Sequence, residues 1–346
     1  MPVRVAAVLA TLTASLGLAP ISAAPVFTDV CVINDARAME LSGLVATSTG
    51  YVAVNDSNFD PSRIRIFFLD RSCKVTRTLG YPTAARDPED LAVGPDGTLW
   101  VADIGDNVTS DARRTTIAVW RVPDSGNPVI NRLTYPDGPH DAEAMLINGD
   151  GRPVIVTKEM SGVSSIYTTT GTLQPNTANG VPLTKVGEFK PQPTGVINPF
   201  GLIGEELVTG AASSPDHHRV ALRTYAAAYE WDVPDDDVVK AITGKAPRYT
   251  PLPDEVQGES IAYTTDGAAF LTVSDRSDSP VTIRRVTPGT QPATSPPPSP
   301  TAAAAGTTER TSPLSGIPIW VTIGVAAVGL VLAALGFIGV RRARRA

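Results

Sequence analysis

The strongest constraint in this sequence of 346 residues is a β-rich unit that recurs about every fifty residues. Its five copies begin at Glu40, Glu89, Glu143, Thr209 and Glu259. Most copies consist of a short apolar segment, a tight turn of the Asp-Gly type and a second β-rich segment. Because an Asp-Gly turn between two such segments is a strong hairpin signal, each unit predicts an antiparallel pair of strands.

Two further strands are predicted within the units. A third strand follows the hairpin in all five, at residues 64–70, 117–123, 165–169, 227–233 and 281–286. A fourth, less apolar strand follows in four of them, at residues 75–81, 131–135, 183–189 and 248–253. Four-stranded units at this period are typical of the blades of a β-propeller. We therefore predict an all-β fold, a five-bladed propeller.

The fifth unit lacks a fourth strand before the sequence becomes rich in proline and threonine. Residues 26–33 precede the first unit and have strand character, so we predict that they complete the fifth blade and close the ring. Residues 191–207 exceed the repeat length, and if they contain strands the propeller has six blades. The alternative architecture is a large β-sandwich, which does not require repeats that begin with the same residue.

The two ends of the chain are predicted to be targeting and membrane segments. Residues 1–24 contain Arg4, an apolar run and then small residues, which predicts a secretory signal peptide cleaved after Ala23 or Ala24. The alternative is an N-terminal membrane anchor. Residues 317–340 are 24 positions without a charge, and a helix of that length, about 36 Å, spans a bilayer. The arginines within 341–346 then predict a cytoplasmic tail.

These segments leave residues 25–286 as an exported propeller and residues 287–316 as an extended stalk rich in proline and threonine. The ends hold five arginines and no acid, so the remainder carries 24 basic and 35 acidic residues. This acidic balance argues against a nucleic-acid partner and favours cations. Outside the cytosol, Cys31 and Cys73 are expected to form a disulfide between the closing strand and the first blade; two buried free thiols are the alternative.

Acidic residues recur at the start of the first strand and at the end of the second strand of the predicted hairpins. Antiparallel pairing places the start of the first strand beside the end of the second, so these acids converge on one mouth of the central channel. The set comprises Glu40, Asp56, Glu89, Asp103, Glu143, Glu159, Glu259 and Asp275. Crowded carboxylates raise one another's pKa unless they are countered, by a bound cation, by Lys158 and Arg223, or by backbone N–H groups of neighbouring blades. The last possibility gives the acids a purely structural role.

Local sequence favours a cation at this mouth. The stretch from Asp56 to Asp60 carries oxygen ligands at alternate positions, as calcium loops do, and Asp103 to Asn107 is similar in kind. Neither stretch is a complete calcium loop. Because the ligands would all be oxygens, calcium is the predicted ion rather than zinc.

Nucleophilic chemistry has little support in the sequence. It contains no Gly-x-Ser-x-Gly, no phosphate-binding loop and no His-Glu-x-x-His motif. His217 and His218 fall in a predicted turn on the opposite face. His140 lies three residues before Glu143 and is a candidate ligand-binding residue or general base, with a solvated surface position as the alternative.

The segment from Glu89 to Asp103, with Gly-Pro-Asp-Gly before Leu-Trp-Val-Ala-Asp, resembles a blade of the propeller group that includes NHL repeats, gluconolactonase-like proteins and phytase-like or esterase-like propellers. The units that begin with glutamate are most similar to the phytase-like branch. That resemblance implies a calcium-dependent phosphoesterase with carboxylate ligands at one end of the channel. The matching positions are Glu40, Glu89, Asp103, Glu143 and Glu259.

Three functions follow from these observations. The first is a membrane-tethered extracytoplasmic propeller that binds a cation, calcium, or a small polar ligand at its acidic mouth. The second is a calcium-dependent hydrolase of phosphate or carboxylic esters. The third is a scaffold whose rim binds another envelope protein.

Overall fold

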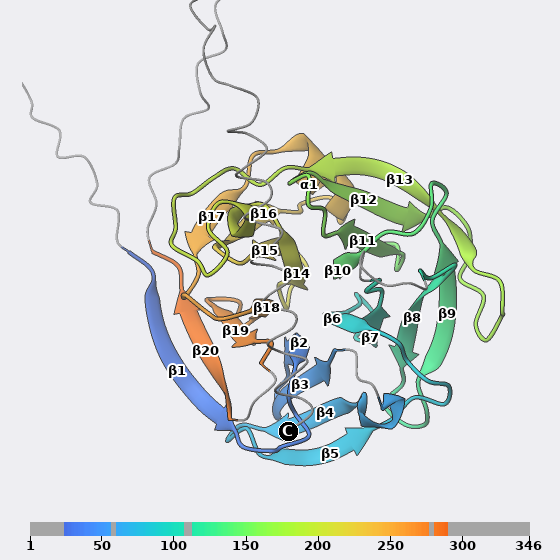
Figure 1. Ribbon diagram of the computed structural model, residues 1–346, viewed down its shortest axis with the longest axis horizontal. Helices are drawn as coiled ribbons and strands as arrows, with labels where there is room; N and C mark the ends of the chain where they lie inside the picture. The colour runs from blue at the N-terminus through green and yellow to red at the C-terminus, as the bar shows by residue number, and fades with distance from the viewer. Residues whose placement is uncertain (1–23, 57–59, 107–112, 277–279, 290–346) are drawn as a thin grey trace, which may run out of the picture. The chain divides into compact units, whose positions relative to one another are not determined.

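The computed structural model describes residues 24–56, 60–106, 113–276 and 280–289. Within them the chain forms strands β1 to β20, one short α-helix and two 3-10 helices (Figure 1). Contacts divide the chain into a unit Met1–Ala293, which holds all the described residues, and a second unit, Thr294–Ala346.

Groups of four consecutive strands pair side by side and antiparallel. The first group is β2 (Leu41–Ala46), β3 (Gly50–Asn55), β4 (Ile66–Asp70) and β5 (Val75–Leu79). The second is β6 (Pro88–Val93), β7 (Leu99–Asp103), β8 (Ile117–Val122) and β9 (Val129–Thr134). The third is β10 (Ala142–Ile147), β11 (Pro153–Thr157), β12 (Ser164–Thr169) and β13 (Val181–Phe189). The fourth is β14 (Val208–Ser213), β15 (Arg219–Thr224), β16 (Ala227–Asp232) and β17 (Arg248–Pro251).

The last sheet combines the two ends of the described chain. It contains β18 (Gly258–Tyr263), β19 (Phe270–Ser274) and β20 (Val281–Thr287), and β1 (Val26–Ile33) pairs antiparallel with β20 at its outer edge. The prediction that residues 26–33 complete the last sheet is therefore confirmed. The third and fourth predicted strands also fall within a few residues of those observed.

The sheets are arranged around a central axis (Figure 1). The first strand of each group contacts that of the next, in the order β2, β6, β10, β14, β18 and back to β2. The second and third groups are further joined by a short parallel pairing between β9 and β13. The chain therefore has an all-β, propeller-like fold, and the sheets circle rather than stack as in a sandwich.

The core lies between neighbouring sheets, because each strand contributes alternate apolar side chains to both of its faces. Trp120 on β8 packs with Val54, Ile66 and Leu91 between the first and second groups. Trp231 on β16 is also fully buried, in the interface of the third and fourth groups.

The disulfide Cys31–Cys73 is present, with 5.8 Å between the two Cα atoms, as the sequence predicted. It links β1, the strand that completes the last sheet, to the turn after β4 in the first sheet. The bond therefore crosses the seam where the two ends of the ring meet.

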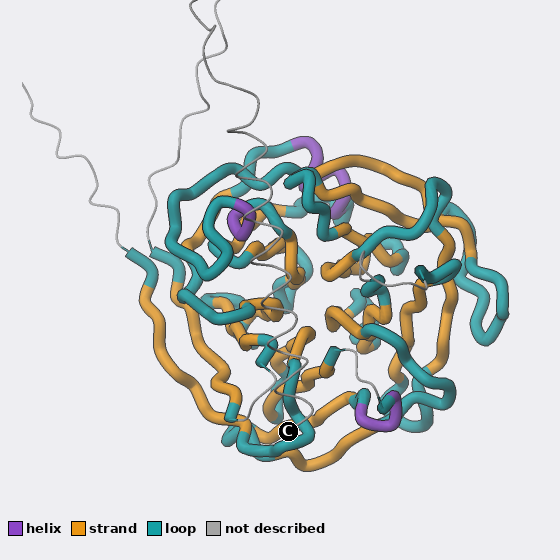
Figure 2. The backbone as a smooth tube through the Cα atoms, viewed as in Figure 1, coloured by secondary structure: helices purple, strands orange, loops and turns teal. Residues whose placement is uncertain are grey.

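Some of the chain departs from the strand repeat (Figure 2). Helix α1 (Val238–Gly244), which the sequence analysis did not predict, begins after Asp237, whose side chain accepts the N–H of Lys240. Helix η1 (Pro61–Arg63) follows β3. Residues 191–207 add no strand to any sheet and contain only η2 (Ile203–Glu205), so the condition for a six-bladed ring is not met.

The predicted signal peptide (1–24, except its last residue), stalk (287–316, beyond residue 289), membrane segment (317–340) and basic tail (341–346) lie outside the described residues. Among the helices that are described, none combines the length and the apolar character needed to cross a membrane.

Candidate functional site: an acidic channel mouth

A β-bulge near the start of every innermost strand determines which side chains meet at one end of the channel. The pairing between the first and second strands skips one residue in each group. A bulged residue has no direct partner and its side chain is re-aimed, so the five skipped positions are structurally equivalent. They are Ser42, Glu89, Glu143, Thr209 and Glu259.

This register corrects one predicted equivalence. The counterpart of Glu89 in the first group is Ser42, whose hydroxyl donates a 2.9 Å hydrogen bond to Glu89 Oε2. Glu40 lies two residues earlier and corresponds to Asp87 and Asp141 in the next two groups. Its carbonyl accepts the N–H of Asp56, at 2.8 Å. The mouth therefore has a second, outer row of carboxylates, two of which the sequence analysis missed.

The ends of the second strands give a similar correction. In four of the groups, one residue follows the last residue of the second strand that pairs with the first strand. These residues are Asp56, Lys158, Tyr225 and Asp275. Asp103 is one position earlier and Glu159 one position later. Because side chains alternate along an extended chain, a shift of one residue changes the direction in which a side chain points.

Asp103 and Glu159 accordingly bind elsewhere. Asp103 is buried, accepts a 2.8 Å bond from the Arg114 guanidinium and a 3.2 Å bond from the Trp120 indole, and therefore fastens its own sheet. Glu159 contacts His140 Nδ1 at 3.0 Å. The two acids predicted as cation ligands at these positions are thus engaged in other contacts.

His140 is held in an aromatic and acidic cluster rather than beside Glu143. Its Nε2 lies 3.1 Å from Asp137 and 3.0 Å from the Tyr167 hydroxyl, while its Nδ1 contacts Glu159. The ring also packs against Tyr135, with 5.0 Å between the centroids. With both nitrogens engaged, His140 is not placed to act on the acids of the mouth.

One group of carboxylates in the mouth has the spacing of a cation site. One oxygen each of Asp56, Asp87 and Glu89 lies within 4.8 Å of the other two. Burial, together with the charges of Asp56 and Asp87, raises the pKa of Glu89 well above its usual value. Gly105 borders this group, and a Cβ atom there would lie 2.2 Å from Glu89 Oε1, so a larger residue would displace the carboxylate.

Lys158 occupies the other side of the mouth. Its ammonium forms an ion pair with Glu143 and lies 3.8 Å from Glu259 Oε1. The Tyr225 hydroxyl accepts a 2.9 Å bond from Lys158 and donates a 3.1 Å bond to Glu259. Burial still raises the pKa of Glu143 well above its usual value, although Lys158 opposes the shift.

Asp275 adds a further buried carboxyl. It is 8% exposed, and burial, with the charges of Glu259 and Glu40, raises its pKa to about 8. The Gln257 amide donates a 3.0 Å bond to Oδ2. Asp275 Oδ1 and Glu143 Oε2 have no hydrogen-bond donor within the part of the chain that the structure describes.

Two buried residues with ionisable side chains, Arg223 and Asp90, have structural roles at the centre of the ring. Arg223, a predicted ligand-binding residue, is fully buried and donates to the Ser260 carbonyl at 2.7 Å and to Glu255 at 3.4 Å. Asp90, which the sequence analysis did not single out, accepts the backbone N–H groups of Met145 at 2.8 Å and Ala211 at 3.1 Å. Asp90 therefore joins β6 to β10 and β14.

The remaining predicted oxygen ligands are distributed as follows. Asp60 precedes η1 and accepts the N–H of Ser62 at 3.0 Å. Asp106 accepts a 2.8 Å bond from Arg113, and its N–H donates to Asp141 at 2.9 Å. Asn58 and Asn107 lie outside the described residues.

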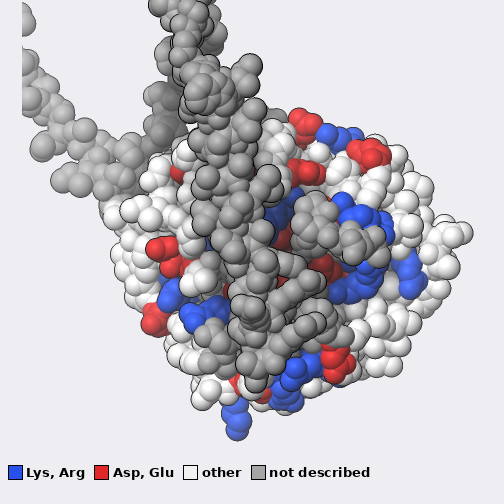
Figure 3. Space-filling model, viewed as in Figure 1, with Lys and Arg blue, Asp and Glu red and all other residues white. Residues whose placement is uncertain are grey.

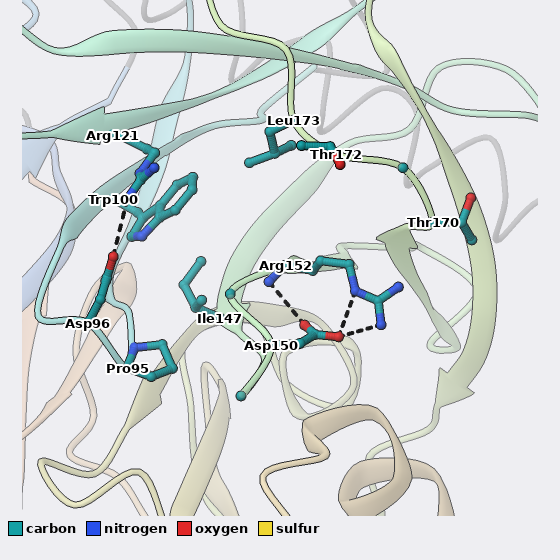
Figure 4. A pocket seen from close by; sticks show the side chains of 13 residues that line it. Pro95, Asp96, Trp100, Arg121, Ile147, Asp150, Arg152, Thr170, Thr172 and Leu173 are labelled. Atoms are coloured by element: carbon teal, nitrogen blue, oxygen red, sulfur yellow. Dashed lines mark hydrogen bonds and ion pairs between the residues drawn. The ribbon is translucent and has the colours of Figure 1, made fainter.

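Acidic and basic side chains are interspersed on the face of the molecule shown in Figure 3. A separate cavity of about 630 Å³ lies at the turns that join the first and second strands of the second and third groups, at the opposite ends of those strands from the mouth (Figure 4). Its charged lining forms ion pairs, Asp96 with Arg121 and Asp150 with Arg152. None of the predicted site residues lines it.

No protein-family model matches the chain, and no curated protein matches it. Among solved structures, it is similar to the Cps50 (Swd1) β-propeller domain of Myceliophteria thermophila, with 11% identity, a TM-score of 0.39, and coverage of 75% of this chain and 100% of that one. Glutaminyl cyclase from Myxococcus xanthus is 12% identical, with a TM-score of 0.45, and the match covers 77% of this chain and 98% of the cyclase chain. Virginiamycin B lyase from Staphylococcus aureus is 14% identical, with a TM-score of 0.36, and the match covers 71% of this chain and 66% of the lyase chain.

Proposed function

We propose that this protein is a five-bladed β-propeller that binds a divalent cation, calcium, at the acidic mouth of its channel. The observation that carries the proposal is the convergence of Asp56, Asp87 and Glu89, with one oxygen of each within 4.8 Å of the others. Calcium takes six to eight oxygen ligands at about 2.3–2.6 Å, and the three carboxylates, one after β3 and two at the start of β6, supply part of that shell. Oxygen ligands also favour calcium over zinc.

Electrostatics supports the same proposal. Burial and the neighbouring carboxylates raise the pKa of Glu89, which means that its ionised form is disfavoured in the mouth. A bound divalent cation would remove that penalty and release protons. The ammonium of Lys158 forms its ion pairs with Glu143 and Glu259.

A calcium titration of the full chain by calorimetry tests the proposal. We expect heat of binding, and a melting temperature that rises with calcium, because a ligand at a hundred times its Kd stabilises the folded state by about 2.7 kcal/mol. Asp87→Asn and Glu89→Gln should each weaken binding by at least about tenfold, since each removes a charged ligand. Asp254→Asn, the same change at an exposed carboxylate, is the control. No heat and no thermal shift with the unaltered chain would contradict the proposal.

A second candidate function is calcium-dependent hydrolysis of phosphate or carboxylic esters. It is favoured by the Lys158–Tyr225–Glu259 chain of contacts, which places an ammonium and a hydroxyl in the same mouth as the acidic group. The resemblance of the repeats to NHL and phytase-like propellers also supports it. A panel of ester substrates with and without EDTA distinguishes the candidates, because a binding module turns over none of them.

We further propose that the propeller is exported and tethered to the membrane by residues 317–340. The apolar run and the arginines after it support this orientation, as does the disulfide Cys31–Cys73, since such bonds persist outside the cytosol. Protease added to intact cells should remove the propeller. Protection in intact cells, with cleavage only after lysis, would contradict the proposal.

A further inference from the structure

An apolar lip stands beside the acidic mouth. Six large apolar side chains are exposed there, with Ile197 at 83% and Leu202 at 80%. The lip consists of Met160, Ile197, Phe200, Leu202, Ile203 and Val256. Exposed apolar side chains scattered singly are ordinary, whereas a group of them beside a polar site marks an interaction surface.

Contacts place the lip next to the acids. The Phe200 ring packs against Tyr225, with 4.4 Å between centroids, and the Tyr225 hydroxyl contacts Lys158 and Glu259. The Tyr225 N–H donates to the Gly204 carbonyl at 3.1 Å, which fixes the residues around η2 at the end of β15.

The flanks of the lip come from the neighbouring groups. The loop that holds Met160 reaches the same place, because a Cβ atom on Gly162 would lie 2.3 Å from Glu206 Oε2. Val256 directly precedes Gln257, whose amide binds Asp275.

The segment that carries most of the lip is held in one conformation by its own polar residues. Glu205 accepts the N–H groups of Thr194 and Gly195, the latter at 2.8 Å. Asn198 accepts the N–H of Phe200 at 3.0 Å and donates to the Gly201 carbonyl at 3.0 Å. These bonds fix the loop while its apolar side chains face solvent, so a partner would meet a preformed surface and order little on binding.

The mouth beside this lip has unused hydrogen-bond acceptors. Glu143 Oε2 and Asp275 Oδ1 are buried and have no donor among the described residues. An ammonium or guanidinium group supplies donors to these oxygens, and its charge favours the ionised form of both carboxyl groups.

We propose that the mouth and the lip together bind a polypeptide segment in which a lysine or arginine is flanked by apolar side chains. The cationic group enters the mouth and donates to Glu143 and Asp275, while the apolar neighbours cover the lip. This inference rests on the proposed function, because it uses the same mouth as a cation site. An anionic bilayer is the less complementary occupant, since the acids of the mouth repel its headgroups.

The probe is a fluorescein-labelled peptide of alternating lysine and leucine, titrated with the full chain in phosphatidylcholine nanodiscs, with empty nanodiscs as the blank. We expect saturable binding that falls at least about tenfold when serine replaces leucine or glutamate replaces lysine in the peptide. In the protein, Ile197→Ser combined with Leu202→Ser should weaken binding by a similar factor. Both side chains are exposed, so the fold should survive.

The matched control is Val30→Ser combined with Val32→Ser, which removes exposed apolar side chains from β1. Equal binding of the serine-substituted peptide, or of the lip variant, would overturn the inference. So would lip-dependent binding to vesicles of phosphatidylglycerol without binding to the peptide. Calcium calorimetry separates the two proposals: calcium binding without peptide binding refutes this inference alone, and peptide binding without calcium binding refutes the proposed function alone.

Discussion

Replacing Asp275 with asparagine should make the protein more stable at alkaline pH. Burial and the charges of Glu259 and Glu40 raise the pKa of this carboxyl from 3.8 to about 8. Asparagine has nearly the same shape, carries no charge, and its carbonyl oxygen can still accept the bond from the Gln257 amide. The substitution therefore removes the ionisation while it preserves the packing.

The sign of the effect follows from proton binding. Between pH 4 and pH 8 the folded state holds a proton on Asp275 that the unfolded chain has released, so the free energy of unfolding falls as the pH rises. At about 1.4 kcal/mol for each pH unit, the fall has an upper limit of roughly 6 kcal/mol. Relaxation and entry of water reduce such penalties, and we expect about 2–4 kcal/mol.

The assay is urea unfolding of both proteins in EDTA at a series of pH values from 5 to 8.5. The stability of the Asp275→Asn variant relative to the unaltered chain should rise steadily over this range. Asp254→Asn, at an exposed position, should show no such trend. Parallel stability profiles for the unaltered chain and the Asp275→Asn variant would refute the reasoning.

Two further predictions concern the ring itself. Asp90→Ala leaves the N–H groups of Met145 and Ala211 buried without an acceptor, which costs about 1–3 kcal/mol for each group. Urea unfolding should therefore show that the free energy of unfolding falls by roughly 3 kcal/mol or more, and by less for Asp90→Asn. An unchanged unfolding midpoint would contradict this role of Asp90. Loss of the disulfide, by Cys31→Ser with Cys73→Ser, should lower the free energy of unfolding by about 4 kcal/mol, because the bond closes a loop with a sequence separation of 42; equal stability of the oxidised chain and the variant would argue against it.

The repeat made most of the fold predictable from sequence. The turn signals and the apolar segments locate both hairpin strands in each group, and they do so because these features are local. The strand at residues 26–33 was predictable by elimination, since the last sheet lacked one member. Helix α1 was missed because its short apolar pattern lies where the repeat predicts only a connection.

The candidate site was predictable in its location but not in its exact members. A single bulged residue sets the register of each innermost strand, and the sequence does not reveal a bulge. Glu40 was therefore matched with Glu89, although Ser42 is the true counterpart. Asp103 likewise lies one position before the residues that point into the mouth from the other groups, and its side chain therefore binds Arg114 and Trp120. Asp87, two residues before Glu89, is a cation-site candidate that the aligned repeats would have indicated once the bulge was known.

The most direct test of the account is a crystal structure of the protein grown with calcium and then with manganese as an anomalous scatterer. We predict a peak between Asp56, Asp87 and Glu89, with carboxylate oxygens at about 2.3–2.6 Å from the calcium. Its absence at saturating metal, with the three carboxylates well ordered and hydrogen-bonded only to water or backbone, would contradict the account.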